Sequence, residues 1–406
     1  MAIFDRLFGA RGNVAGKVPP QPGGPKLSRK LAHKQAKRPV WARVGPGNAV
    51  STPRRYDRLA DEGYRQNVVA NRAVNLVAKA VASIPLVLMR GDERVSEHPL
   101  LNLLARPNPR LKGENFLYNF VGYYMIAGNS YALKVGPEGG EPKELWLMRP
   151  DTMKVIEGAD GLAAGFEQHV LGKKQRYDAG AVLHLKSFNP LSDWYGLAPL
   201  EAAAMAVDAH NEGSRWNLAL IQNGGTPSGV LYQEDADAPL TDAQFDKLKE
   251  QVEQQYTGAL NAGRPLLLEG GLKWQEMGMS PKDMDWASAK NMTAREIATA
   301  FGVPPQMMGV PDAQTYSNYA EARQSLWEDT VIPLAQDIAA ELTNWLVPDF
   351  ETPTRSGGER LSLAIDLDDV PALAAKRAAR FDRIASAAFL SDDEKRAALG
   401  FEKKNN

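Results

Sequence analysis

The segment from Arg295 to Leu334 constrains this chain more than any other part. It reads REIATAFGVPPQMMGVPDAQTYSNYAEARQSLWEDTVIPL. A helix predicted to begin near residue 284 should end at Gly302, because glycine leaves a helix easily and a residue before proline disfavours the α region. Helical periodicity resumes near Asn318 and continues to Val347, with Pro333 predicted to kink the second helix.

Between these helices, residues 306–317 cannot continue a helix. They carry Gly309 and Pro311 among polar groups. A loop of this kind, held between two long helices, suits a moving or gating element. We therefore expect hinge positions within it and at its start, at Gly302, Pro304, Pro305 and Gly309.

Composition excludes several classes of protein. At 406 residues the chain is predicted to split into two to four units. It has no cysteine, which excludes disulfides, thiolate zinc sites and cysteine nucleophiles and fits assembly in a reducing cytoplasm. The five histidines lack metal-ligand spacing, and no run approaches the about 18 apolar residues of a membrane span. We expect no metal, no cofactor, no membrane partner and no secretion signal.

The net charge of −1 hides an asymmetry at the N-terminus. Thirteen Lys or Arg residues lie between Arg6 and Arg58, whereas the first 58 residues contain only the acids Asp5 and Asp57. The same stretch is rich in Pro and Gly. It is predicted to be a disordered arm, with contact to nucleic acid or an acidic partner as the alternative. The start, MAIFDRLFG, could form a docking peptide with one apolar helical face.

Alternating and helical patterns divide the rest of the chain. The region 130–188 is β-rich, with strands predicted at SYALKV, KELWLMR, MKVIEG, FEQHVL and AVLHLKSF. Two further strands are predicted at PLVLMR and RLSLAIDL. An insert over 226–281 combines strand SGVLY, a Thr241-capped helix and strands RPLLLEG and LKWQEM. Helices are predicted over 64–84, HPLLNLLA with Ser96 as its N-cap, 113–127, 199–223, 284–301, 319–347, 370–386 and 391–399.

Two of these helices have distinctive faces. The helix over 113–127 is rich in aromatic residues, and this stripe is interpreted as core packing rather than a platform for stacked bases. The helix over 199–223 is rich in alanine. Small side chains allow helices to approach closely, so this helix is expected to pack along its length.

Searches for catalytic signatures find little. The chain lacks GxxxxGK[ST], HExxH and a GxGxxG after a strand. Its nearest approach to a nucleophile elbow, GNSYA, ends in alanine, and it leaves Ser130 and His184 as a possible hydrolase pair. The acids Asp366, Asp368 and Asp369 could bind a metal, but strand-end and N-cap roles explain them better. We expect a structural protein rather than an enzyme.

The order of several short motifs carries a family resemblance. EHPLLNLLARPNP, YYMIAGNSYALKV, WLMRPDTMKV, HLKSFNPLSDWYGLAPLEAA, NGGTPSGVL, REIATAFGVPPQMMG and SNYAEARQSLWEDTVIPL follow one another between about residues 65 and 350. In this order they resemble the portal proteins of long-tailed bacteriophages, a family that also occurs in phage-derived gene transfer agents.

The resemblance implies an α+β portal fold that assembles into a dodecameric ring. It has long stem helices, a β-rich wing, a small α/β clip insert and a short helical crown. The implied parts are a basic arm (1–60), wing (61–198), stem helix (199–225), clip (226–281), stem helix (282–302), tunnel loop (303–318), second wing part (319–369) and crown or tail (370–406).

The implied function is passage of double-stranded DNA, without sequence preference, through a ring at one capsid vertex. Implied partners are further copies of the chain, the large terminase subunit, head–tail adaptor proteins and a major capsid or scaffold protein. The ring would nucleate the procapsid in the bacterial cytoplasm and remain in the virion. DNA-facing candidates are Lys290, Arg295, Gln306, Gln314, Thr315, Ser317 and Asn318.

Electrostatics gives an independent reason for such a channel. Duplex DNA carries one charge per about 1.7 Å, and each phosphate neutralised by Lys or Arg adds to affinity. A strongly basic wall repeated around a ring would hold DNA still. A near-neutral chain whose loop offers uncharged polar side chains (Gln306, Gln314, Thr315, Ser317 and Asn318) lets it slide. Lys290 and Arg295, read as lying on one side of their helix, could equally form salt bridges between subunits with Asp208 or Glu212. A serine hydrolase and a basic-armed nucleic-acid binder remain as alternatives.

Overall fold

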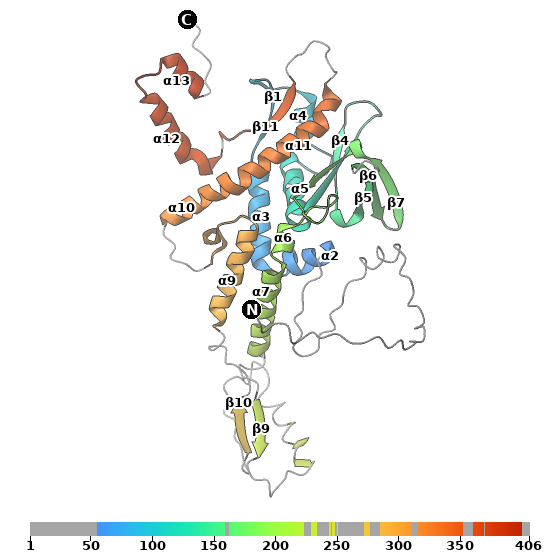
Figure 1. Ribbon diagram of the computed structural model, residues 1–406, viewed down its shortest axis with the longest axis vertical. Coiled ribbons are helices and arrows are strands. Elements are labelled where there is room, and N and C mark those ends of the chain that lie inside the picture. Colours follow the sequence, from blue (N-terminus) through green and yellow to red (C-terminus); the bar gives the residue numbers. More distant parts are fainter. Residues whose placement is uncertain are drawn as a thin grey trace, which may run out of the picture. The chain divides into compact units, whose positions relative to one another are not determined.

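The computed structural model describes residues 55–158, 162–222, 229–233, 243–244, 246–247, 250, 272–276, 285–310, 316–351, 360–368 and 370–399. The basic arm and its docking peptide therefore lie outside the described residues, apart from residues 55–60. Figure 1 shows the described elements in sequence colours. No helix in these ranges is long and apolar enough to span a membrane.

Two helices form the centre of the main core. Helix α3 (Val68–Ala82) buries a face of small residues, including Ala70, Ala73 and Val77, and packs on α5 (Gly113–Ala127). Small side chains let the two helices approach closely. The aromatic helix was predicted with the observed bounds, and its Phe116 and Phe120 are buried in this core.

The elements around α3 include one correction. A short α2 (Tyr56–Arg58) and a π-helical segment (Leu59–Arg65) precede α3. Helix α4 (Pro99–Ala105) is capped by His98, whose side chain accepts a hydrogen bond from the backbone N–H of Leu100, and not by Ser96 as predicted. Proline at the first helical position fixes the start of the helix two residues later than Ser96 would allow.

The β-rich region forms two antiparallel three-stranded sheets. In one, β3 (Asn129–Val135) lies between β4 (Glu144–Met148) and β8 (Val182–Lys186). In the other, β6 (Ala163–Val170) lies between β5 (Met153–Glu157) and β7 (Lys173–Asp178). A second apolar cluster, which includes Tyr131 and Phe166, joins the two sheets. The five predicted strands are all present, and β7 is an additional one.

A third sheet connects distant parts of the chain. Strand β1 (Leu86–Arg90) pairs with the neighbouring β2 (Glu93–Val95) on one side and with β11 (Leu361–Ile365) on the other. Both β1 and β11 were predicted as strands, but their pairing was not. It fixes the C-terminal part of the chain to the core next to α3.

The alanine-rich region is two helices, not one. Helix α6 (Pro199–Ala202) and α7 (Ala204–Gln222) are separated at Ala203. Strands β9 (Gly229–Gln233) and β10 (Leu272–Glu276) then form an antiparallel pair, and α9 (Trp286–Ala300) follows. The predicted strand RPLLLEG and most of the predicted Thr241-capped helix lie outside the described residues.

After the loop the chain is helical from 316 to 350. Helix α10 (Tyr316–Ser325), a π-helical segment (Leu326–Val331) and α11 (Ile332–Phe350) follow without a break. Pro333 lies inside this continuous helical stretch, as predicted, and occupies the first turn of α11. A π-helical segment directly precedes it, at the point where proline's missing N–H interrupts the backbone bonds. Two short helices, α12 (Ala374–Ala385) and α13 (Asp392–Ala398), close the described chain as predicted.

Candidate channel helices and the segment that follows them

Helices α7 and α9 pack side by side and antiparallel (Figure 1). They meet closely at Gly213, where an added Cβ would lie 2.8 Å from Cζ2 of Trp286. Trp216 also contacts Trp286, with ring centroids 5.3 Å apart at 60°. Contacts between the later part of α7 and the first turn of α9 are those expected of antiparallel helices. The absence of a side chain at Gly213 makes room for the indole of Trp286.

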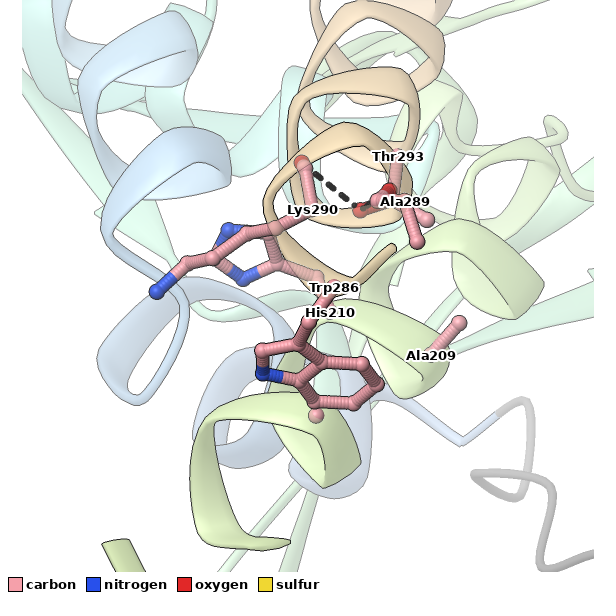
Figure 2. Close-up of a pocket in the computed structure, with 7 residues that line it drawn as sticks. Ala209, His210, Trp286, Ala289, Lys290 and Thr293 are labelled. Carbon is pink, nitrogen blue, oxygen red and sulfur yellow. Dashed lines mark hydrogen bonds between the residues drawn. The ribbon is translucent and has the colours of Figure 1, made fainter. Parts of the chain in front are cut away.

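A small cavity of about 120 Å³ lies between the two helices. Figure 2 shows Trp286 on one side of it and His210, Lys290 and Thr293 around the remainder. Ligand pockets for drug-sized molecules are usually about 300–1,000 Å³, so this cavity is too small for a nucleotide. Burial, and then the charge of nearby Lys290, lower the pKa of His210.

A buried polar cluster fastens α7 to the start of α3. Asn67 is 1% exposed; its Oδ1 accepts from the backbone N–H groups of Val69 (3.0 Å) and Ala70 (2.9 Å) and so caps α3. Its Nδ2 donates to Oδ1 of Asn211 at 3.0 Å and approaches Nδ1 of His210 at 3.2 Å. Since that amide is a donor, Nδ1 of His210 accepts. This cluster was not predicted, although an asparagine just before an apolar helical period is a cap signal.

The C-terminus of α9 is a Schellman motif. The N–H of Val303 bonds the carbonyl of Ala298 (2.9 Å), and that of Gly302 bonds the carbonyl of Thr299 (2.9 Å). Gly302 has φ +65°. Its carbonyl accepts a hydrogen bond from Oγ1 of Thr330 at 2.7 Å. The predicted helix end at Gly302 is confirmed, and the motif ties it to the π-helical segment before α11.

The first half of the predicted tunnel loop belongs to the core. Val303 (1% exposed), Met307 (8%) and Val310 (6%) are buried, and Pro305–Met308 forms a 3-10 helix. This corrects the expectation that residues 303–318 form one polar loop. Three apolar side chains, spaced by four and then three residues, fold inward. Pro304 and Pro305 lie in this packed stretch, while Gly309 is exposed with φ +73°.

The DNA-facing candidates are placed differently from one another. Gln306 is half-buried in the 3-10 helix, and Gln314 and Thr315 lie outside the described residues. Ser317 and Asn318 belong to the first turn of α10, which starts earlier than predicted, and Asn318 is exposed.

Lys290 and Arg295 are both exposed on α9 but do not share one side of it. Five residues at 100° each place them about 140° apart around the helix, which corrects that expectation. Glu212, considered as a salt-bridge partner for them, pairs with Arg215 of its own helix at 2.5 Å.

The geometry contradicts a hydrolase built on Ser130 and His184. Ser130 pairs with Leu185 in the register of β3 and β8, whereas His184 pairs with Tyr131. Neighbouring residues of a strand point to opposite faces, so the hydroxyl and the imidazole lie on opposite faces of the sheet. His184 Nε2 is instead 3.0 Å from Oδ1 of Asn129, and Oγ of Ser130 has no hydrogen-bond partner among the described residues.

The acidic residues after β11 have structural partners. Asp366 pairs with Arg94 (2.8 Å) and accepts from the backbone N–H of Asp368 (3.0 Å); Asp369 lies outside the described residues. Within the described ranges, no group of three or more His, Cys, Asp or Glu side chains could hold a metal ion.

The fold and the antiparallel helix pair thus define an α+β protein. The side chains considered for catalysis or metal binding, such as His184 and Asp366, lie in packing and hydrogen-bonding roles. A family model described as phage portal protein matches residues 68–400. The chain belongs to this family. It is 41% identical over 353 residues to an uncharacterised protein of Rickettsia bellii, covering 85% of this chain and 89% of the relative. It is 22% identical over 299 residues to the portal protein of Enterobacteria phage HK97, covering 71% and 69%.

Solved structures give the same result. The chain is similar to a chain in the neck of an empty gene transfer agent particle, with 42% identity, a TM-score of 0.69, and coverage of 89% of this chain and 97% of that one. A chain in the native particle's neck, computed with C12 symmetry, gives 41% identity and a TM-score of 0.67 over the same coverage. An HK97-family portal protein from Corynebacterium diphtheriae shares the fold at 18% identity, with a TM-score of 0.56 over 80% of this chain and all of that chain.

Proposed function

We propose that this chain forms a closed ring in the neck of a gene-transfer-agent-type particle, around a channel for double-stranded DNA. The observation that carries the proposal is the 41% identity, over 97% of its length, to a chain in a neck computed with C12 symmetry. A dodecameric ring of this chain would match that symmetry. Negative-stain electron microscopy of the purified protein should show rings with a central hole, and monomers under all conditions would refute the proposal.

Helices α7 and α9 are the proposed stem, and the β9–β10 pair belongs to the proposed clip. The wing combines residues 61–198 with 319–369, the clip spans 226–281, and the crown spans 370–406. Two boundaries change with the helices: the first stem helix begins at Ala204 rather than 199, and the tunnel loop narrows from 303–318 to the residues after Val310. The burial of Val303, Met307 and Val310 supports the second change.

The channel wall is proposed to let DNA slide rather than to hold it. A chain of net charge −1 does not build a strongly basic ring. Since every neutralised phosphate raises affinity and twelve copies repeat each contact, a few exposed cations and uncharged polar groups suit translocation. Lys290, Arg295 and Asn318 are the described candidates, and Gln314, Thr315 and Ser317 extend the set.

The proposed partners act on the ring from outside it. Large terminase would supply ATP hydrolysis during packaging, adaptor proteins would join the ring to the tail, and capsid or scaffold protein would surround it during procapsid assembly. No catalytic step is assigned to the chain itself. The basic arm, through residues 6–58, remains a second candidate for nucleic-acid contact, and its deletion should leave ring assembly intact.

Deletion within the loop tests the channel assignment. Removing residues 306–317 is unsuitable, because it would take Met307 and Val310 out of the core. Removing only residues 311–315 should leave rings intact and reduce retention of packaged DNA in assembled particles, measured as DNA protected from nuclease. Loss of rings with unchanged packaging in any that remain would contradict the assignment.

A further inference from the structure

The C-terminal helices α12 and α13 are fixed to the core only at their beginning. Val370 and Leu373, just before α12, are buried in the main core at 3% and 8% exposure. Lys376 then pairs with Glu328 at 2.9 Å. Arg377 donates to the backbone carbonyls of Leu367 (3.1 Å) and Val370 (3.0 Å).

After these contacts with the core, the large apolar side chains of α12 and of the turn before α13 are exposed. Helix α12 has no buried residue. Phe381 is 49% exposed, and Phe389, in the turn before α13, is 86% exposed. Aromatic side chains carry large apolar areas, so two exposed within nine residues indicate a surface that another protein covers.

Helices α12 and α13 carry opposite charges, and only some of these charges have partners among the described residues. Lys376 and Arg377 are engaged as above, and Arg380 donates to the carbonyl of Ala398 at 3.0 Å. Helix α12 carries four cations and one acid, whereas the first turn of α13 carries three acids. Glu394 is used locally: its carboxylate accepts from the N–H of Ser391 at 2.8 Å in a capping box. Among the described residues, Arg383, Asp392 and Asp393 have exposed side chains without an ion-pair or hydrogen-bond partner.

We propose that these charges pair between neighbouring copies of the chain. Arg383 of one copy meets Asp392 and Asp393 of the next, and the contact covers Phe381 and Phe389. Two unlike charged surfaces on one chain make a head-to-tail contact between copies. Such a contact produces a closed ring when the rotation from one copy to the next divides a full turn evenly. This inference rests on the proposed ring and assigns one of its interfaces.

The absence of cysteine in the chain allows a direct test by cross-linking. The double variant Arg383→Cys with Asp392→Cys is treated with a short bis-maleimide, because an Arg–Asp ion pair can hold the Cα atoms beyond the 7 Å limit for a disulfide. A head-to-tail contact gives a ladder beyond dimer on a denaturing gel. Cross-linked monomer only, or dimer only, would overturn the inference.

A mixture of the two single-cysteine variants gives the matched experiment. It should yield dimers only, whereas each single variant alone should yield monomer. A control that pairs Asp392→Cys with Lys173→Cys, an exposed lysine on β7, should give no ladder. If rings are seen by electron microscopy and no ladder forms, the inference fails and the proposed function stands. If no rings form, both fail.

Charge exchange supplies a second readout. Arg383→Glu should raise the protein concentration below which rings dissociate at low salt, because it places three carboxylates together and only added salt screens their repulsion. Combining it with Asp392→Lys and Asp393→Lys should restore the wild-type value. Equal ring stability of the wild type and Arg383→Glu, or no recovery in the exchanged variant, would contradict the contact.

Discussion

Replacing Gly302 by alanine tests whether the end of α9 is a rigid cap. At φ +65° a Cβ is strained, and here it would also lie 2.5 Å from Oγ1 and 3.2 Å from Cγ2 of Thr330. Thr330 would have to move, and its hydrogen bond to the carbonyl of Gly302 would weaken or break. The substitution therefore disturbs both the Schellman motif and its tie to the segment before α11.

The expected cost has three parts. An alanine at positive φ costs about 1–2 kcal/mol. The lost hydrogen bond adds about 0.5–1.5 kcal/mol, and displacement of the threonine adds a similar amount. We expect Gly302→Ala to lower the free energy of unfolding by about 2–5 kcal/mol in total.

Gly309 provides a matched control. It has φ +73°, but no heavy atom of the described residues lies within 4 Å of an added Cβ, so Gly309→Ala should incur the backbone cost alone. Urea unfolding followed by tryptophan fluorescence measures both variants. Trp327, 7% exposed and in the same π-helical segment as Thr330, is a local probe.

Thr330→Ala removes the atoms that the new Cβ would meet. In that background Gly302→Ala should cost no more than Gly309→Ala, so the two substitutions at Gly302 and Thr330 should be non-additive. If Gly302→Ala and Gly309→Ala destabilise equally in the wild-type background, the contact with Thr330 does not constrain the cap and the reasoning is wrong.

Three further predictions concern buried polar groups, each measured by urea unfolding. Asn67→Ala should cost about 2–4 kcal/mol, because it removes a cap and leaves the side chains of His210 and Asn211 without a donor; a cost below 1 kcal/mol would contradict this. Ser130→Ala should be neutral or stabilising, since its hydroxyl has no hydrogen-bond partner in the part of the chain that the structure describes; clear destabilisation would contradict that. Burial, and then Lys186, lower the pKa of His184 to about 3. The unfolded chain binds this proton below about pH 6.5 while the folded chain does not, so stability should fall between pH 6.5 and 3, by up to about 2 kcal/mol at pH 5. His184→Gln should reduce this slope, and an unchanged slope would contradict the assignment.

Local sequence patterns predicted most elements, because the spacing of apolar residues within each of these helices and strands matches the period of the element itself. Helix α5 and strands β3, β4, β5, β6 and β8 were all placed from apolar spacing and turn residues. Strand β7, KKQRYD, was missed because almost every side chain in it is polar and exposed, so no alternation is visible. The break at Ala203 also has no sequence signal, since alanine favours a continuous helix.

Long-range partners left no comparable signal. The strands β1 and β11 are each apolar, but nothing in either says that residue 88 pairs with residue 363. The same limit applies to Asn67, whose cap role is local while its contacts with His210 and Asn211 span more than 140 residues. Ser130 and His184 show the reverse: a catalytic pair is suggested by residue type and excluded only by strand register.

The packing around Gly302 also limits how the loop after α9 can gate a channel. A hinge at Gly302, Pro304 or Pro305 would have to break the Schellman bonds, release the hydrogen bond from Thr330 and expose Val303 and Met307. Exposing two buried apolar side chains costs about 3–6 kcal/mol, which is a large share of the stability of a typical domain. A hinge at Gly309 would carry none of these costs, because Gly309 is exposed and no described heavy atom lies within 4 Å of an added Cβ. We therefore expect any gating movement to begin at Gly309 or later, and to leave the end of α9 in place.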